Sequence, residues 1–273
     1  MLTRPAEQAP SMLHQLHSHG IEAINLPLIQ ITPTTDTAAL QHAWDRINEW
    51  DWLIFVSPSA VDGFFQYAAR AVQPHPASLA LAMTRFAGPG AGTLNALVRW
   101  GVASHQCVGP AADAPEWDSA HLWRAIQNES WTGKKVLMVK GDGGREELTH
   151  QLQQAGATVT LLPAYEKRYP QWDAKQTYQV TTILQNPNNY VWVFSSSFAM
   201  RGLPQRLMAL PQPLPTWPEL ANRLQAWATH PRIVQTAYQL GIQHCQNIRP
   251  GLDGLITQAK LNTPITIHKT TTL

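Results

Sequence analysis

The sequence repeats itself at long range, and this feature constrains the fold more than any other. Residues 14–27 read HQLHSHGIEAINLP and residues 150–163 read HQLQQAGATVTLLP, with six of fourteen positions identical. Two further pairs keep the same order at nearly the same offset: residues 51–63 with 190–202, and residues 97–102 with 237–242. A period of roughly 140 residues is far longer than the units of about 20–50 residues that build solenoids. The repeat therefore predicts two related domains.

Each repeat contains short apolar runs that alternate with helical patterns. Runs such as WLIFV (52–56) and KVLMV (135–139) are typical of buried strands, and turn residues follow each of them. Leucines at helical spacing precede Gly20 and Gly156, and a glycine just past a helix end supplies the left-handed conformation that terminates it. This alternation predicts parallel sheets with helices on both faces.

The repeated Leu-Pro exits indicate where the chain passes between the domains. Extended, proline-bounded segments follow Pro27 and Pro163, so we expect crossings at about 28–35 and 163–170. The alternative is a tandem arrangement that splits near residue 130. We predict these parts: a discontinuous domain of residues 1–31 plus 168–262, a second domain of 36–163, connectors at 32–35 and 164–167, and a tail at 263–273.

The composition excludes some classes of protein. Charged residues make up 14% and the net charge is +2, which lacks the concentrated basic patch of a nucleic-acid-binding protein but suits an anionic ligand. No apolar run reaches the ~18 residues of a membrane span, and the N-terminus lacks a signal-peptide pattern. We therefore expect a cytoplasmic protein that does not bind membranes or nucleic acid.

Small and hydroxyl-bearing residues follow several predicted strands. These loops are Ser57-Pro58-Ser59, the serines 195–197, GPGAGT (88–93) and KGDGGRE (140–146). Ligands of doubly wound sheets bind beyond the carboxyl ends of the strands, and such loops offer N–H groups to carboxylates or phosphates. For any single serine, helix capping is the simpler explanation. Four such loops, distributed over both halves, favour an anion-binding cleft.

Residues that carry catalysis elsewhere are sparse. GPGAGT and KGDGGRE both fail the nucleotide-binding patterns, and no paired-carboxylate, Ser-His-Asp or Cys-His arrangement occurs. The two cysteines show no metal-ligand spacing, and His14 and His17 could share a helix face but have no clear third ligand, so a solvated face is the simpler explanation. Tyr165 is the one distinctive candidate because it lies in the second crossing, where a half-buried linker aromatic is the alternative.

Eight motifs occur in order over residues 2–260: TRPAEQA, PLIQI, DWLIFVSPSAV, FAGPG, WDSAHLW, VLMVKGDGGRE, AGATVTLLPAYEKRYP and HPRI with its following Ala and Gly-Ile. Together they resemble one family, the uroporphyrinogen-III synthases, and its proteobacterial branch most. The resemblance implies an α/β fold of two similar doubly wound, flavodoxin-like parallel-sheet domains, joined by a two-stranded connector with a cleft between them. It also implies a lyase without metal or organic cofactor, which cyclises the linear tetrapyrrole hydroxymethylbilane to uroporphyrinogen III with loss of water and inversion of ring D.

The resemblance also assigns site residues. Tyr165 matches the family's connector tyrosine and is implied to assist departure of the hydroxyl group. The residues implied to bind substrate are Arg4, Ser57, Ser59, Gly88, Gly90, Thr93, Ser119, Gly141, Arg145, Ser196 and Ser197. Glu166, Lys167 and Ala120 depart from the family pattern, which puts contacts from those positions in doubt.

Partners and alternatives follow from the same comparison. The resemblance implies a monomer and leaves open a transient contact with hydroxymethylbilane synthase, the deaminase that makes the substrate. A non-catalytic two-domain binding module for an anionic small molecule would share the cleft. A nucleotide-dependent transferase is a third hypothesis, which the missing nucleotide motifs disfavour.

Overall fold

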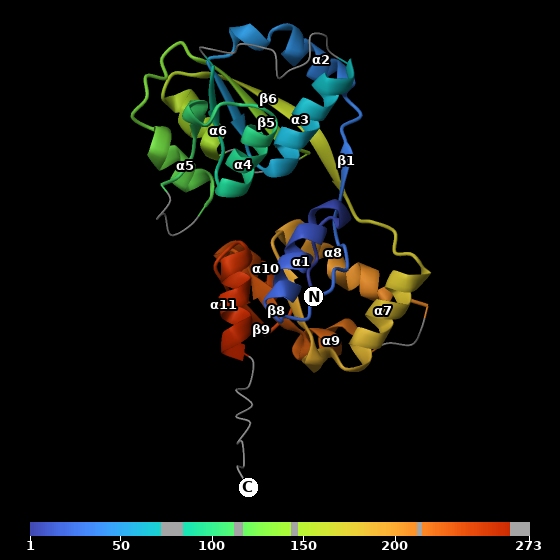
Figure 1. The fold of residues 1–273 in the computed structure, drawn as a ribbon. Coiled ribbons are helices and arrows are strands. Elements are labelled where there is room, and N and C mark those ends of the chain that lie inside the picture. The colour runs from blue at the N-terminus through green and yellow to red at the C-terminus, as the bar shows by residue number, and fades with distance from the viewer. Residues whose placement is uncertain (72–83, 112–116, 143–146, 212–214, 263–273) are drawn as a thin grey trace. The chain divides into compact units, whose positions relative to one another are not determined.

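The chain folds into two compact units (Figure 1). Unit 1 combines Met1–Gln30 with Arg168–Leu273, and unit 2 is Ile31–Lys167. The computed structural model describes residues 1–71, 84–111, 117–142, 147–211 and 215–262. The predicted tail at 263–273 lies outside the described residues.

Unit 2 is built on a six-stranded sheet in the order β1-β6-β5-β2-β3-β4. The strands are β1 (Gln30–Pro33), β2 (Trp52–Phe55), β3 (Arg85–Ala87), β4 (Cys107–Val108), β5 (Lys135–Gly141) and β6 (Thr158–Arg168). Pairing is parallel from β6 through β5, β2 and β3 to β4. The helices are α2 (Thr37–Asp45), η2 (Ile47–Glu49), α3 (Pro58–Ala71), α4 (Ala91–Arg99), η4 (Ser104–Gln106), α5 (Ser119–Ile126) and α6 (Glu147–Gln154).

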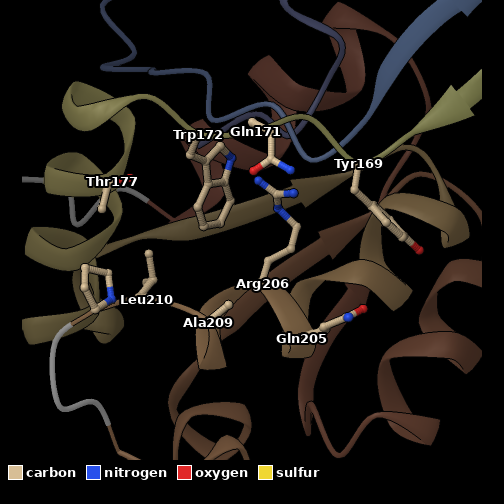
Figure 2. A pocket seen from close by; sticks show the side chains of 9 residues that line it. Tyr169, Gln171, Trp172, Thr177, Gln205, Arg206, Ala209 and Leu210 are labelled. Carbon is tan, nitrogen blue, oxygen red and sulfur yellow. The ribbon is translucent and has the colours of Figure 1, made fainter.

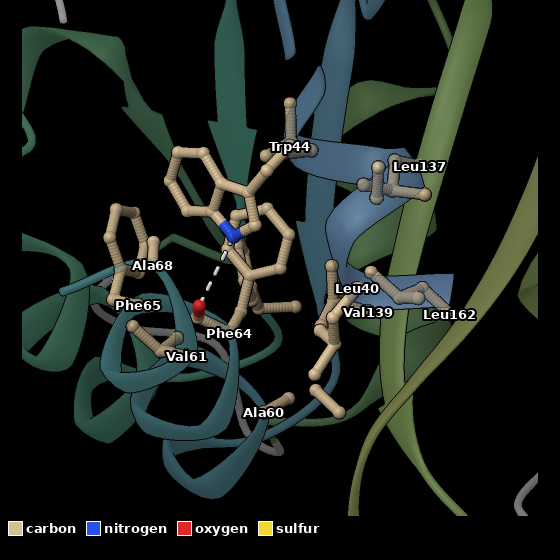
Figure 3. Packing of buried hydrophobic residues seen from close by; sticks show 14 of the residues in the cluster. Leu40, Trp44, Ala60, Val61, Phe64, Phe65, Ala68, Leu137, Val139 and Leu162 are labelled. Atoms are coloured by element: carbon tan, nitrogen blue, oxygen red, sulfur yellow. Dashed lines mark hydrogen bonds between the residues drawn. The ribbon is translucent and has the colours of Figure 1, made fainter. Parts of the chain in front are cut away.

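The two faces of this sheet carry separate cores, because successive side chains of a strand point to opposite faces. Leu53 and Leu137 belong to the cluster that α2, α3 and α4 cover. Ile54 and Met138 belong to the cluster that α5 and α6 cover. On the first face, Trp44 stacks on Phe64 with ring centroids 4.5 Å apart and donates its indole N–H to the Phe64 carbonyl (Figure 3). The sheet is therefore doubly wound, as the sequence predicts.

Unit 1 has a parallel sheet of the same kind. Its strands β7 (Val191–Phe194), β8 (Gln225–Ala228) and β9 (His244–Asn247) pair in that order. Leu2 bridges Asn25 on one side and Val193 on the other, both in parallel, so the order runs Asn25, Leu2, β7, β8, β9. The helices are η1 (Ala6–Gln8), α1 (Pro10–Ser18), α7 (Ala174–Gln185), η5 (Pro187–Asn189), α8 (Ser197–Met208), α9 (Trp217–Arg223), α10 (Pro231–Gln239) and α11 (Leu252–Asn262).

The sequence repeat matches the two sheets strand for strand. When the two copies of the repeat are aligned, Leu2 corresponds to β5 and Asn25 to β6. In the same alignment β7 corresponds to β2, β8 to β3 and β9 to β4. Unit 1 thus combines Leu2 and Asn25 of the first copy with three strands of the second, and unit 2 combines β1, β2, β3 and β4 of the first copy with β5 and β6 of the second. The units divide at residues 30/31 and 167/168 and not near residue 130, as the tandem alternative expected, so the copies of the repeat and the units are out of phase.

The segments expected as connectors are strands. Residues 32–35 begin in β1 and residues 164–167 lie in β6, and these two strands are neighbours in the sheet of unit 2. Strand β6 continues past Pro163 to Arg168; β5 pairs with it as far as Tyr165, and β1 lies on its other side. Reading Tyr165 as a linker aromatic is therefore wrong, since it lies within the sheet.

Two glycines at equivalent points of the repeat admit close packing. Gly63 lies in α3, where an added Cβ would lie 2.5 Å from the Ala164 carbonyl oxygen. Gly202 lies in α8, where an added Cβ would overlap the ring of Tyr169. Both helices can therefore lie directly against the chain that follows Pro163.

We predict that Gly63→Ala destabilises the protein by about 1–3 kcal/mol, because a backbone carbonyl cannot move aside as a side chain can. Gly92→Ala is the matched control, since Gly92 is also helical but an added Cβ would meet only Pro58 at 3.5 Å. Alanine stabilises a helix interior relative to glycine, so Gly92→Ala should be neutral or favourable. Urea denaturation of both variants measures the difference, and equal stabilities would contradict the packing described.

Candidate functional site

Three residues assigned from the sequence meet at the carboxyl ends of β2, β5 and β6. The Tyr165 Oη lies 3.0 Å from the Ser57 Oγ. Gly141 is the strand partner of Tyr165, following a register shift between Lys140 and Gly141. An added Cβ at Gly141 would lie 2.6 Å from the Tyr165 Cζ, so this glycine makes the space that the ring occupies.

Tyr165 is buried, with 4% of its surface exposed, and its ring belongs to the core under α2, α3 and α4. Burial raises the pKa of the phenol, the hydrogen bond with Ser57 lowers it, and the nearby Asp142 carboxylate raises it. The net shift is upward, so the phenol stays protonated at neutral pH. A rigidly held, neutral hydroxyl group of this kind can donate a hydrogen bond or a proton.

Asp142 and Lys167 complete this cluster, and sequence reasoning did not assign them to the site. The Asp142 N–H donates to the Tyr165 carbonyl at 3.0 Å, and the Asp142 Oδ1 accepts from the Lys167 N–H at 2.8 Å. The Lys167 Nζ lies 5.8 Å from the centroid of the Tyr165 ring. These contacts tie the loop after β5 to the end of β6. The sequence does not show the register shift between β5 and β6, and without it the contacts of Asp142 and Lys167 with the end of β6 could not be predicted.

The glycine loop after β3 packs against the start of α5. An added Cβ at Gly88 would lie 2.6 Å from the Thr93 Cγ2, and Thr93 is buried. Trp117 lies close to Gly90, 3.3 Å from where a Cβ would be. Ser119 opens α5 one residue after its cap. The structure thus brings Gly88, Gly90 and Ser119 to one region, with Thr93 packed inward.

The serine loops have capping roles as well. The Ser57 Oγ accepts from the Ala60 N–H at 3.2 Å, and the Ser196 Oγ accepts from the Ala199 N–H at 3.5 Å. Ser59 is buried in the first turn of α3. Helix capping therefore explains part of the serine pattern, as the sequence analysis allowed.

Arg4 and Ser197 lie at the carboxyl ends of adjacent strands in unit 1, because Leu2 pairs in parallel with Val193 of β7. Burial lowers the pKa of the Arg4 guanidinium. No carboxylate in the described part of the chain forms an ion pair with it. The Ser197 Oγ is buried and has no hydrogen-bond partner within the described ranges. Both groups have capacity for a ligand.

His230 is a further residue at the strand ends of unit 1 that sequence reasoning missed. It follows β8 and caps α10, where its Nδ1 accepts from the Arg232 N–H at 3.1 Å. The third repeat pair, at an offset of 140, places His230 opposite Gly90. Because Gly90 was assigned to the site, this correspondence could have indicated that His230 also lies at the strand ends.

Arg145 and Glu166 are the remaining positions that the sequence analysis discussed for the site. Arg145 lies outside the described residues. Glu166, one of the departures from the family pattern, accepts from the Thr35 N–H at 3.2 Å and from the Thr35 Oγ1 at 3.0 Å. This carboxylate therefore fastens the segment after β1 to β6.

Two features are absent from the part of the chain that the structure describes. No group of three or more His, Cys, Asp or Glu there could hold a metal ion. No helix there combines the length and the apolar character needed to cross a membrane.

Comparison with known families decides the relationship. The model of the family described as uroporphyrinogen-III synthase HemD matches residues 11–257. The chain belongs to the uroporphyrinogen-III synthase family. The resemblance read from the eight motifs is therefore confirmed.

Curated relatives agree with this family assignment. A uroporphyrinogen-III synthase of Synechococcus elongatus is 30% identical over 62% of this chain and 61% of its own. One of Proteus mirabilis is 25% identical over 62% of this chain and 80% of its own. A porphyrin biosynthesis protein HemD of Ruminiclostridium josui is 25% identical over 62% of this chain and 32% of its own. The chain thus spans less than two thirds of the length of two of these relatives.

Solved structures of the family share the fold. A mutant uroporphyrinogen III synthase of Thermus thermophilus has a TM-score of 0.57 and 14% identity, covering 95% of this chain and 96% of that one. A uroporphyrinogen-III synthetase of Helicobacter pylori has a TM-score of 0.52 and 13% identity, covering 88% and 95%. The predicted two-domain α/β fold is confirmed.

The electrostatic account of Tyr165 predicts opposite effects of two substitutions. Ser57→Ala should raise the pKa of Tyr165, because it removes the hydrogen bond that lowers this pKa, and Asp142→Asn should lower it. A pH titration of ¹³Cζ-tyrosine NMR signals measures both, with Tyr165→Phe identifying the resonance. A fall or no change in Ser57→Ala would contradict the account.

The same shift predicts how stability depends on pH. The pKa of Tyr165 lies above its ordinary value of 10.0 in the folded chain, so the unfolded chain ionises first as the pH rises. This contribution therefore makes the free energy of unfolding fall above pH 10. Tyr165→Phe should show a shallower fall than the wild type in denaturation series between pH 9 and about 11. Identical slopes would contradict it.

Proposed function

We propose that this chain is a uroporphyrinogen-III synthase, which cyclises hydroxymethylbilane to uroporphyrinogen III with loss of water and inversion of ring D in tetrapyrrole biosynthesis. The observation that carries the proposal is the buried, protonated Tyr165 phenol that Ser57 and Gly141 hold at the strand ends. It occurs in a chain of the family named for this reaction.

The first chemical step needs a proton donor at the leaving hydroxyl group. When the carbon–oxygen bond breaks, a pyrrole nitrogen supplies electrons to form an azafulvenium cation, and the hydroxyl group leaves as water. The Ser57 Oγ already accepts from the Ala60 N–H, so its own proton is available to the Tyr165 oxygen. The Tyr165 proton is then available to the leaving group. We assign Tyr165 this role as donor.

The later steps need orientation more than acid–base chemistry. A ring D carbon attacks the cation to give a spiro intermediate, which fragments and recloses with ring D inverted, and a proton is then lost. Uncatalysed closure gives the isomer I instead, so the protein's task is selectivity. Holding reacting atoms in one geometry can supply about 7–11 kcal/mol of a barrier in favourable cases.

The substrate's eight carboxylates require cationic and N–H donors. Arg4 offers a guanidinium with no carboxylate partner in the described part of the chain, and Ser197 offers an unpaired hydroxyl group nearby in the sheet order. Gly88, Gly90 and the serine loops offer N–H groups at the strand ends. We propose that these groups bind acetate and propionate side chains. We propose, from the sequence resemblance, that Arg145 and Ser59 also bind substrate carboxylates.

We propose that the enzyme acts as a monomer in the cytoplasm and uses no cofactor. We also propose a transient contact with hydroxymethylbilane synthase, because the substrate closes spontaneously once it is released.

A product-isomer assay tests the function. Hydroxymethylbilane is generated in situ with a deaminase, the purified chain is added, and the products are oxidised to porphyrins and separated by chromatography. Isomer III that depends on this protein supports the proposal. Isomer I alone, from a folded chain that still binds the tetrapyrrole, would overturn it in favour of the binding module.

Tyr165→Phe should slow formation of isomer III by about tenfold or more, because the donor is lost. We expect KM to change little, since the ring stays in place. Tyr67→Phe is the matched control, because Tyr67 lies in the same unit and donates its hydroxyl group to Gln41 Oε1, at 2.7 Å, away from Ser57 and Gly141. A rate for Tyr165→Phe equal to that of Tyr67→Phe would exclude Tyr165 as the donor.

A further inference from the structure

Unit 1 contains a pocket that the proposed function does not use. Its volume is about 370 Å³, and residues of the segment after β6, of α7 and of the end of α8 line it (Figure 2). The lining residues are Tyr169, Gln171, Trp172, Thr177, Gln205, Arg206, Ala209, Leu210 and Pro211. Trp172, Leu210 and Pro211 supply apolar surface.

The pocket is rigidly built around Trp172 and Arg206. The Trp172 indole N–H donates to the Pro27 carbonyl at 2.9 Å, which fixes the ring. The Arg206 guanidinium carbon lies 4.1 Å from the centroid of that ring, the geometry of a cation–π contact. Figure 2 shows Arg206 extending from α8 toward Trp172 and Gln171.

Tyr169 closes the neighbouring part of this wall. Its ring stacks on Phe198 with centroids 4.5 Å apart, and its hydroxyl group donates to the Phe198 carbonyl at 3.3 Å. Gly202 has no side chain, so the ring can lie directly on α8. The aromatic walls are thus in place before any ligand binds.

Arg206 forms no ion pair with a carboxylate in the described ranges of the chain. The Arg206 Nε is buried and has no hydrogen-bond partner among the described residues. Arg206 is also the single charged residue among the described residues that line the pocket. Burial lowers the pKa of its guanidinium, whose proton is nevertheless retained at neutral pH because arginine is so basic. A planar guanidinium that forms no ion pair within the protein suits a carboxylate.

The pocket is separate from the residues assigned to the reaction. Helix α8 starts at the carboxyl end of β7, where Ser196 and Ser197 lie, and Arg206 is ten residues further along it. At a rise of about 1.5 Å per residue, that is about 15 Å from the serine loop. A ligand here would not occupy the strand ends.

We propose that this pocket binds a small aromatic carboxylate, whose carboxylate pairs with Arg206 and whose ring lies among Trp172, Leu210 and Pro211. The amide groups of Gln171 and Gln205 and the Thr177 hydroxyl group provide further polar partners at the rim. This inference does not depend on the cyclisation reaction, and binding alone tests it.

The experiment is a titration of the full chain with benzoate, with benzamide as the neutral isostere. Calorimetry gives the affinity, and the arginine Nε–H and tryptophan indole N–H signals in ¹⁵N–¹H NMR locate the site. We expect saturable benzoate binding that shifts the Arg206 and Trp172 signals, and benzamide binding at least about tenfold weaker. Binding of benzamide as tight as that of benzoate, or no saturation by benzoate, would overturn the proposal.

Variants of Arg206 and Arg201 distinguish the effect of the Arg206 charge in the pocket from a general effect of removing a positive charge from α8. Arg206→Gln should weaken benzoate binding at least about tenfold, and Arg206→Lys should keep part of it. Arg201→Gln is the matched control, because Arg201 is exposed on the same helix outside the pocket, and it should bind benzoate as the wild type does. Equal weakening by Arg201→Gln and Arg206→Gln would show a general charge effect and overturn the assignment.

Discussion

The site of unit 2 depends on one close approach, that of the Tyr165 ring to the backbone at Gly141. Any side chain at residue 141 would occupy the position of the ring, 2.6 Å from its Cζ. With the ring admitted, β6 continues beside β5 and the phenol reaches Ser57 at the end of β2. Burial then keeps the phenol protonated, because the charged form is disfavoured away from water. Packing, hydrogen bonding and acid–base state thus follow from one missing Cβ.

The out-of-phase repeat explains why the chain crosses between units twice. Parallel pairing joins Leu2 of the first copy to Val193 of the second, and the Thr3 Oγ1 donates to the Val193 carbonyl at 2.7 Å. Each sheet is completed only by strands from both copies. Neither half of the sequence alone could form a full parallel sheet with these neighbours, so the duplicated chain must fold as a whole.

Much of this could be predicted from the sequence, because strand and helix periods are local signals. The repeat, the glycine helix stops and the apolar runs predicted doubly wound parallel sheets, and the structure confirms them. Tyr165 and Ser57 were assigned through motifs. The register shift at Gly141 was not predictable, since it depends on how two strands pair, and so Asp142 and Lys167 were missed. The extended, two-stranded character of the crossings was expected, but the sequence did not indicate that residues 164–167 continue β6 within the sheet of unit 2. The pocket at Arg206 was also not predictable. Its Trp172 is fixed by a hydrogen bond to Pro27, 145 residues away in the sequence, and no sequence pattern indicates that contact.

The proposed function requires that the tetrapyrrole reacts at the Tyr165 phenol. A crystal structure of the chain with uroporphyrinogen III, grown without oxygen, tests this requirement. We predict that the macrocycle lies within hydrogen-bonding distance of the Tyr165 Oη, with its carboxylates on the loops that follow the strands. A macrocycle that binds elsewhere and leaves Tyr165 and Ser57 without contact would contradict it.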